Sequence, residues 1–129
     1  MNKIEEAQLI LKDLGLPIQQ QNKICALTLL ALSDIKQNNS WKIATRKSVT
    51  LSKDIIEFVN LHYAQEYKAN TRESFRKIAL KPFIDNGIAV LNPDNPNLSP
   101  TSSNTHYALT ELALKTILKY NTPEWNLVV

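Results

Sequence analysis

The segment NKICALTLLALSDIK at residues 22–36 constrains the fold most, because it is apolar on almost every side of a helix. Other elements have to cover such a helix, since a polar face that could contact water is missing. The chain has 129 residues, 43% of them hydrophobic, which is enough for one core and too few for two ordinary domains. We therefore predict a single domain over residues 1–129, built around a central helix at about 19–36.

Three other segments have apolar residues at helical spacing. The first starts near the N-terminus and ends before Gly-Leu-Pro at 15–17, where glycine stops a helix and proline cannot continue it. The second is expected at about 52–64, after a short strand at 48–50. The third is expected at about 110–120. Together they supply enough helix to surround the central one.

A further helix begins with the sequence NTRESFRKIAL at residues 70–80. Asn70 and Glu73 fit a capping box, in which each side chain accepts from a backbone amide of the other residue. Pro82 lacks an amide hydrogen, so the regular helix is expected to end near Lys81. The inner face has apolar residues at helical spacing: Phe75, Ile78, Ala79 and Phe83.

After Gly87 the apolar spacing changes from about 3.6 to about 2. The runs GIAVLNP and THYALT predict two short strands, joined by a loop rich in proline, serine and asparagine. The order of helices followed by a β-ribbon and a last helix is that of a winged helix-turn-helix, a mainly α fold with a small β-ribbon. Six residues, 65–70, separate the two helices of the motif, which favours the winged variant over the compact one.

Charge is unevenly distributed along the chain. Residues 41–81 hold nine Lys and Arg against four acidic residues, a net charge of +5, whereas the whole chain has +3. A basic segment between neutral and acidic flanks is typical of a surface that faces a polyanion. A solvated charged face is the alternative that composition alone leaves open.

Several functional classes lack their residues. Cys25 is the single cysteine and is expected to be a small core residue, and the two histidines, His62 and His106, have no metal-ligand companions. Two glycines cannot form a glycine-rich phosphate loop. No apolar run is long enough for a membrane helix and the acidic N-terminus is unlike a signal peptide, so we expect a cytoplasmic protein without a membrane partner.

One pattern imitates a nuclease. A common metal-dependent type needs an aspartate on one strand and an acidic-x-lysine on the next, to hold Mg²⁺ and steady the attacking water. Glu66-Tyr67-Lys68 and Asp94 resemble these parts, but their order is reversed and both lie in predicted turns or loops. We therefore expect no catalytic residues and no metal ligands in this chain.

Several stretches resemble one known family. They are LGLP at 14–17, ALTLLALSDIK at 26–36, IIEFVNLHYAQEYKANTRESFRK at 55–77, PFIDNGI at 82–88 and TPEW at 122–125. This pattern resembles the N-terminal domain of the BsuBI/PstI family of type II restriction endonucleases. The most specific part is EYKANTRESFRK. Pro82 departs from the family, which more often keeps a good helix former there.

The resemblance implies a winged-helix module that binds duplex DNA. It also implies that the parent enzyme has a separate C-terminal nuclease domain, dependent on Mg²⁺ and absent from these residues. Palindromic cleavage favours a homodimer of the full-length enzyme. The alternatives are a protein-interaction or dimerisation domain of the same enzyme, with an apolar patch at Trp125, Leu127, Val128 and Val129, and a standalone winged-helix regulator.

Within the DNA-binding reading, Arg72 and Arg76 lie one turn apart and are candidates to contact guanine edges. Thr71 and Ser74 could add polar contacts near the helix start. The residues expected to contact phosphates are Lys42, Arg46, Lys47, Lys77 and Lys81. Alternatively, the two arginines pair with Glu73 or Asp85 and read nothing.

Overall fold

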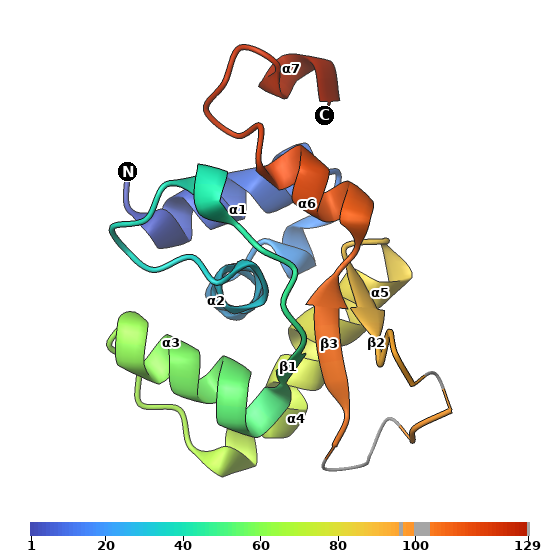
Figure 1. The fold of residues 1–129 in the computed structure, drawn as a ribbon. Coiled ribbons are helices and arrows are strands. Elements are labelled where there is room, and N and C mark those ends of the chain that lie inside the picture. The colour runs from blue at the N-terminus through green and yellow to red at the C-terminus, as the bar shows by residue number, and fades with distance from the viewer. Residues whose placement is uncertain (96, 100–103, 129) are drawn as a thin grey trace.

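The computed structural model describes residues 1–95, 97–99 and 104–128. The central helix is α2 (Lys23–Ser33), and every residue from Cys25 to its end is buried. Figure 1 shows α2 at the middle of the molecule, with α1 (Lys3–Asp13) above it, α3 (Glu57–His62) below it and the strands beside it. The prediction of a central helix is confirmed, although α2 is shorter than expected because Asn22 caps its start and Asp34 ends it in the left-handed conformation.

The N-terminal helix α1 (Lys3–Asp13) ends where the sequence predicted. Its capping box is formed by Asn2 and Glu5, whose side chains each accept from the other's backbone amide at 2.8 and 3.0 Å. Gly15 follows with a φ of 89°, a conformation that glycine adopts without strain. A short 3-10 turn, η1 (Ile18–Gln20), then leads into α2.

Two continuous helical segments follow, and Figure 1 shows α3 and α4 in the lower part of the molecule and α5 higher. The first joins the π-helical η3 (Leu51–Ile56) to α3 (Glu57–His62). The second joins η4 (Ala69–Thr71), α4 (Arg72–Phe75), the π-helical η5 (Arg76–Leu80) and α5 (Lys81–Asp85). They occupy the positions of the two motif helices, and we call the second one, residues 69–85, the recognition helix.

Three expectations about the recognition helix were wrong. Ile78, expected on the inner face, is exposed. Asn70 forms no capping box with Glu73, because it lies inside the 3-10 turn η4 while Glu73 pairs with Arg76. The helix also does not end near Lys81. It continues through Pro82 because the preceding turn is π-helical, with the Lys81 amide donating to the Arg76 carbonyl five residues back.

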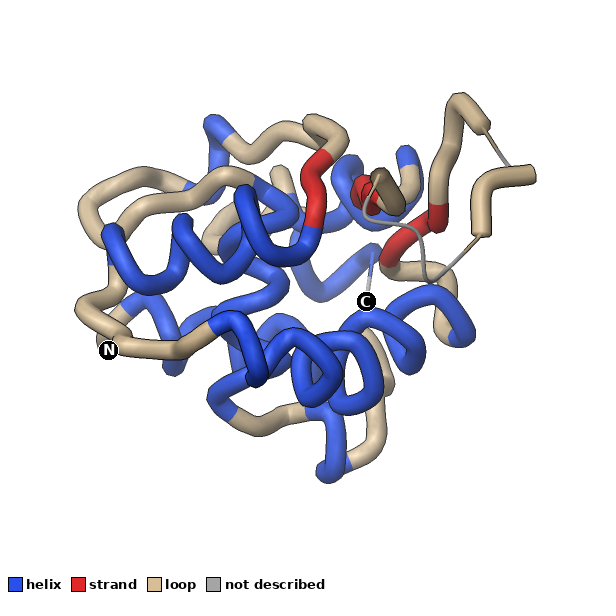
Figure 2. The backbone as a smooth tube through the Cα atoms, turned by 90° about the horizontal axis from the view of Figure 1, so that it is seen from below, coloured by secondary structure: helices blue, strands red, loops and turns tan. Residues whose placement is uncertain are grey.

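The sheet has three antiparallel strands in the order β1-β3-β2. The predicted hairpin is confirmed as β2 (Ala89–Leu91) and β3 (His106–Leu109), with Val90 opposite Ala108. The predicted strand before α3 is also present as β1 (Val49–Thr50), and it pairs with β3. Figure 2 shows the strands side by side at the start of the helix that contains α3. Residues 96 and 100–103 of the predicted loop lie outside the described residues.

The last predicted helix is α6 (Glu111–Ile117), capped by Thr110. The short α7 (Trp125–Val128) follows it and was not predicted. The aromatic rings of Trp41, Tyr120 and Trp125 form an edge-to-face chain with centroid separations of 5.9 and 5.2 Å, and we call these three residues the tryptophan cluster. Trp41 belongs to the 3-10 turn η2 (Trp41–Ile43).

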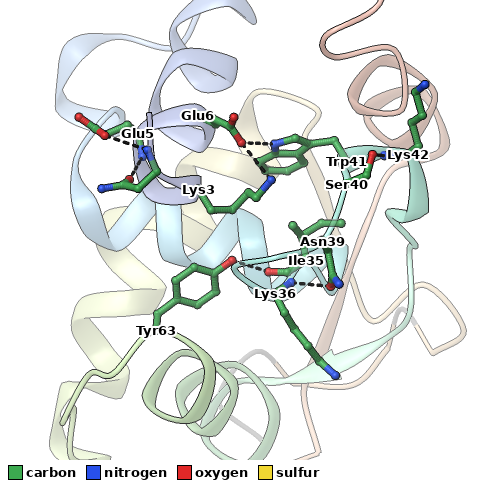
Figure 3. A network of polar contacts seen from close by, with 11 residues as sticks. Lys3, Glu5, Glu6, Ile35, Lys36, Asn39, Ser40, Trp41, Lys42 and Tyr63 are labelled. Atoms are coloured by element: carbon green, nitrogen blue, oxygen red, sulfur yellow. Dashed lines mark hydrogen bonds and ion pairs between the residues drawn. The ribbon is translucent and has the colours of Figure 1, made fainter.

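Helix α1 binds both indoles of the tryptophan cluster. The Trp41 Nε1 donates to Glu6 at 3.0 Å, and Lys3 pairs with the same carboxylate at 3.0 Å, as Figure 3 shows. The Trp125 Nε1 donates to Asp13 at 3.0 Å. Trp125 is therefore buried, so its predicted place in an exposed apolar patch was wrong. Leu127 and Val128 are exposed, and Val129 lies outside the described residues.

The fold is a winged helix-turn-helix, mainly helical, with a small three-stranded sheet. The described part of the chain contains no helix that is both long and apolar enough to cross a membrane.

Candidate nucleic-acid interface

The turn between the two motif helices is held by Asn60 of α3. Its side-chain amide donates to the Tyr67 carbonyl at 2.8 Å, and its side-chain oxygen accepts from the Tyr67 amide at 3.0 Å. The Tyr67 ring then packs edge-to-face on Phe75, with centroids 5.1 Å apart. A turn longer than the compact type is thus tied at both ends, and it sets the position of the recognition helix relative to α3.

Arg72 lies at the start of α4 and lines a hollow between the two motif helices and the residues that precede β3. It is half-buried, and within the described residues it makes no hydrogen bond or ion pair. Lys53 lines the same hollow. Two cationic side chains therefore line the same hollow, and no carboxylate of the described residues binds Arg72. The remaining residues that line the hollow are Thr50, Leu51, Ser52, Asn104 and Thr105.

Arg76 lies one turn further along and is bound to Glu73. Its Nε donates to the Glu73 carboxylate at 3.2 Å, and its Nη2 donates to the other oxygen. Hydrogen bonding by Arg76 lowers the pKa of Glu73, and the same bond raises the pKa of Arg76. The side chain also lines a groove against Tyr107 of β3. The alternative in which Glu73 pairs with an arginine is thus confirmed for Arg76.

The other candidates on the recognition helix differ in exposure. Lys77 is 69% exposed and lies 3.9 Å from Glu73, a loose contact. Ser74 is exposed. The Thr71 hydroxyl donates to the Lys68 carbonyl at 2.5 Å, so it closes the helix start. Lys81 pairs with Asp85 at 3.3 Å.

The three basic residues predicted before β1 do not share one place. Lys42 belongs to η2, which Figure 1 shows near α1 and α6, at the opposite end of the molecule from α4. The Arg46 Nε donates to the Leu109 carbonyl at 3.0 Å, which fixes this side chain at the end of β3. Lys47 is exposed and lines a groove with Lys53, Asp54 and Glu57.

The wing consists of β2, β3 and the described residues between them. Asn92 is fully buried and closes the hairpin, because its amide and its side-chain oxygen bond to the carbonyl and amide of His106 at 2.8 Å each. The His106 ring contacts the Asn104 carbonyl and the Asp94 carboxylate. These two contacts, the carbonyl first, raise the pKa of His106, and the imidazole lowers the pKa of Asp94.

The imitation of a nuclease motif does not form a site. Glu66 is exposed in the turn between α3 and η4, and Asp94 is bound to His106 in the wing. Across residues 1–95, 97–99 and 104–128, no three His, Cys, Asp or Glu side chains are grouped so that they could hold a metal ion. These residues do not fit a Mg²⁺ centre, and we derive no hydrolytic step from them.

Four basic residues of the recognition helix and one of η3 define what we call the basic face. Sequence reasoning missed Lys53, although its place three residues after the predicted strand at 48–50 indicated that it lies at a helix start. Asn60 and Asn92 were missed because their partners lie seven and fourteen residues away. The basic face comprises Lys53, Arg72, Arg76, Lys77 and Lys81.

Known proteins share both the sequence and the fold. The family model for the BsuBI/PstI restriction endonuclease HTH domain matches residues 1–129. The type II restriction enzyme BsuBI of Bacillus subtilis is 39% identical over 125 residues, which cover 97% of this chain and 39% of the enzyme. The type II restriction enzyme AplI of Arthrospira platensis is 31% identical over 91 residues, covering 70% and 28%.

A solved structure, that of the SdaI restriction endonuclease, superposes with a TM-score of 0.91 at 35% identity. It is matched over 97% of this chain and 39% of that one. The chain thus spans about 39% of the BsuBI enzyme and 28% of AplI. Since the family model covers the whole chain, the chain belongs to the BsuBI/PstI restriction endonuclease HTH domain family.

Proposed function

We propose that this chain is a DNA-binding module of a BsuBI/PstI-like type II restriction endonuclease and positions the enzyme on duplex DNA. The observation that carries the proposal is the basic face. Arg72 lies in a hollow lined also by Lys53, with no hydrogen bond or ion pair to it from the described residues. A recognition helix enters the major groove with the residues near its N-terminus, where Arg72 lies.

The DNA contact that we propose for each residue of the basic face follows from the bonds that its side chain already makes. Arg72 makes no hydrogen bond or ion pair with the described residues, so its guanidinium can form the bidentate contact that guanine O6 and N7 accept. Arg76 is bound to Glu73 and must release this carboxylate before it can read a base. Lys77 and Lys53 suit phosphates, which give affinity without sequence information. Lys42 is not part of the proposal, because it lies at the other end of the domain.

The named relatives are type II restriction enzymes, of which this chain covers a minor part. We therefore place Mg²⁺-dependent cleavage in a nuclease domain outside these residues, with the module as its DNA-positioning partner. The same module in a cytoplasmic enzyme would act next to a second copy when the site is palindromic.

Fluorescence anisotropy of labelled duplex DNA tests the proposal directly. The purified chain should bind, and its affinity should fall steeply when salt rises from ~50 to ~200 mM, because cations on the protein replace counterions of DNA. Absence of binding at the low salt concentration, or an affinity that does not respond to salt, would rule it out.

A further inference from the structure

Pro82 removes one backbone hydrogen-bond donor from the recognition helix, although the helix continues to Asp85. In a regular α-helix the amide of residue 82 would donate to the Ile78 carbonyl, four residues earlier. Proline has no amide hydrogen, so it cannot supply this donor. The carbonyl belongs to the π-helical η5, in which the Lys81 amide reaches the Arg76 carbonyl instead.

A donor for the Ile78 carbonyl comes from another helix. The Cys25 Sγ of α2 lies 3.2 Å from the Ile78 oxygen and donates its hydrogen to it. Cys25 is fully buried, and this burial raises its pKa to about 11, so the thiol keeps its hydrogen at neutral pH. The contact joins the central helix to the turn of the recognition helix that precedes Pro82.

We propose that Cys25 is a positioning residue for the recognition helix, because its thiol donates to the carbonyl that an amide at position 82 would serve in a regular α-helix, and thereby holds the wide turn of η5 in place. One extra residue in a turn rotates the side chains on either side of it by about 100° relative to each other. The wide turn therefore decides which basic side chains share the basic face. The consequence for DNA rests on the function proposed above, whereas the bond itself does not.

Carbonyl chemical shifts can test the bond in the intact chain. Labelling isoleucine with ¹³C at the carbonyl and alanine with ¹⁵N selects the Ile–Ala peptide bonds, which are Ile43–Ala44, Ile78–Ala79 and Ile88–Ala89. The Ile78 signal reports the bond, and the other two are internal references. In Cys25→Ala the Ile78 signal should move, while it should stay close to the wild-type position in Cys25→Ser, which retains a donor.

Pro82→Ala provides a second route to the same carbonyl. An alanine at 82 has an amide that can donate to Ile78, so the Ile78 shift in Cys25→Ala/Pro82→Ala should return to that of Pro82→Ala alone. Thr28→Ala is the matched control on α2, because its hydroxyl donates to Ile24 of its own helix at 2.7 Å. It should leave the Ile78 signal unchanged even if it lowers stability.

An Ile78 signal that is the same in Cys25→Ala as in the wild type overturns the proposal. The same conclusion follows if Thr28→Ala moves the signal as much, because the effect would then be general loosening. Should Cys25→Ala not fold, two other comparisons decide: Cys25→Ser against the wild type, and the double variant against Pro82→Ala. An Ile78 signal that is displaced in both comparisons contradicts the bond.

DNA binding gives the functional readout. Cys25→Ala should weaken binding roughly two- to tenfold, the range of a net hydrogen bond, with an unchanged salt slope because no charge is lost. Cys25→Ser should restore most of this loss. If the wild type binds no DNA, the proposed function fails while the Ile78 signal still decides the positioning bond. If DNA binds and Cys25→Ala binds equally well, the positioning role fails alone.

Discussion

The tryptophan cluster and the basic face differ in where their charged side chains find partners. At the cluster, Glu6 and Asp13 of α1 each accept from a tryptophan indole, and Lys3 adds an ion pair. On the basic face, Arg72 makes no bond within the described residues and Lys77 has one loose contact. The first region uses its charges to fix the fold. Arg76 and Lys81 are paired with Glu73 and Asp85, whereas Lys53, Arg72 and Lys77 have no close ion pair with the described residues and stay available to a polyanion.

The largest effect is expected for a substitution in the tryptophan cluster. Trp41→Ala removes a buried ring and the indole hydrogen bond to Glu6, and truncation of a buried Trp costs about 3 to 5 kcal/mol of unfolding free energy. Urea denaturation measures this loss. DNA affinity of the folded protein should hardly change, and a loss below ~1 kcal/mol would show that the cluster is not structural.

Arg72→Ala removes a cation from the basic face instead. It should change urea stability only slightly, because the side chain makes no hydrogen bond or ion pair with the described residues and only its charge acts on Glu73 and Tyr107. Binding to the preferred sequence should weaken by about 1 to 3 kcal/mol, or roughly 5- to 150-fold, with a smaller loss on unrelated sequences. Anisotropy titrations with both kinds of duplex measure this. Equal losses on both would instead assign Arg72 to a phosphate.

A smaller effect concerns the wing. The raised pKa of His106 means that its pairing with Asp94 stabilises the fold fully below the unfolded histidine pKa and is lost as pH rises through the folded pKa. The pairing is also lost at low pH, when the pH falls through the lowered pKa of Asp94 and this carboxylate is protonated. Asp94→Asn should lower the His106 pKa, as followed by its ring NMR signal. An unchanged titration would show that the carboxylate is not its partner in solution.

The smallest expected effect is at α7. Burial of Trp125 leaves Leu127 and Val128 as the exposed apolar side chains of α7 within the described residues. Two such side chains are far too few for the roughly 1,000 Å² of a stable interface. Leu127→Asp should therefore leave the mass measured by light scattering unchanged and monomeric. A wild-type dimer that this substitution dissociates would revive the interaction alternative.

Periodicity predicted the elements whose apolar pattern depends on near neighbours. The all-apolar segment gave α2 its central place, and the change of period after Gly87 predicted the hairpin. Partners distant in sequence were beyond that reasoning: the exposed position predicted for Trp125 failed because Asp13, 112 residues away, binds its indole. The break expected at Pro82 failed because the preceding turn is π-helical, with the Lys81 amide donating to the Arg76 carbonyl, and apolar spacing does not predict such a turn.

The sequence predicted the recognition helix that carries the candidate site and the exposure of its polar side chains. Arg72, Ser74 and Lys77 are half-buried or exposed, as a helical wheel indicates. The distinction between Arg72 and Arg76 depends on which of them Glu73 binds. Glu73 lies three residues before Arg76, a favourable spacing on a helix, and directly after Arg72, an unfavourable one. Lys42 and Lys47 looked equivalent because they are close in the basic segment of the sequence. In space they are apart, since the chain between them crosses from one end of the domain toward β1.

The salt dependence of DNA binding in two paired variants tests the central claim most directly. Lys53→Ala/Lys77→Ala removes two cations from the basic face, and Lys42→Ala/Lys115→Ala removes two from the end that carries η2 and α6. The slope of log affinity against log salt should decrease in magnitude by about 2 in the first protein and stay unchanged in the second. Equal slopes in both, or a decrease confined to the second, would contradict the assignment of DNA to the basic face.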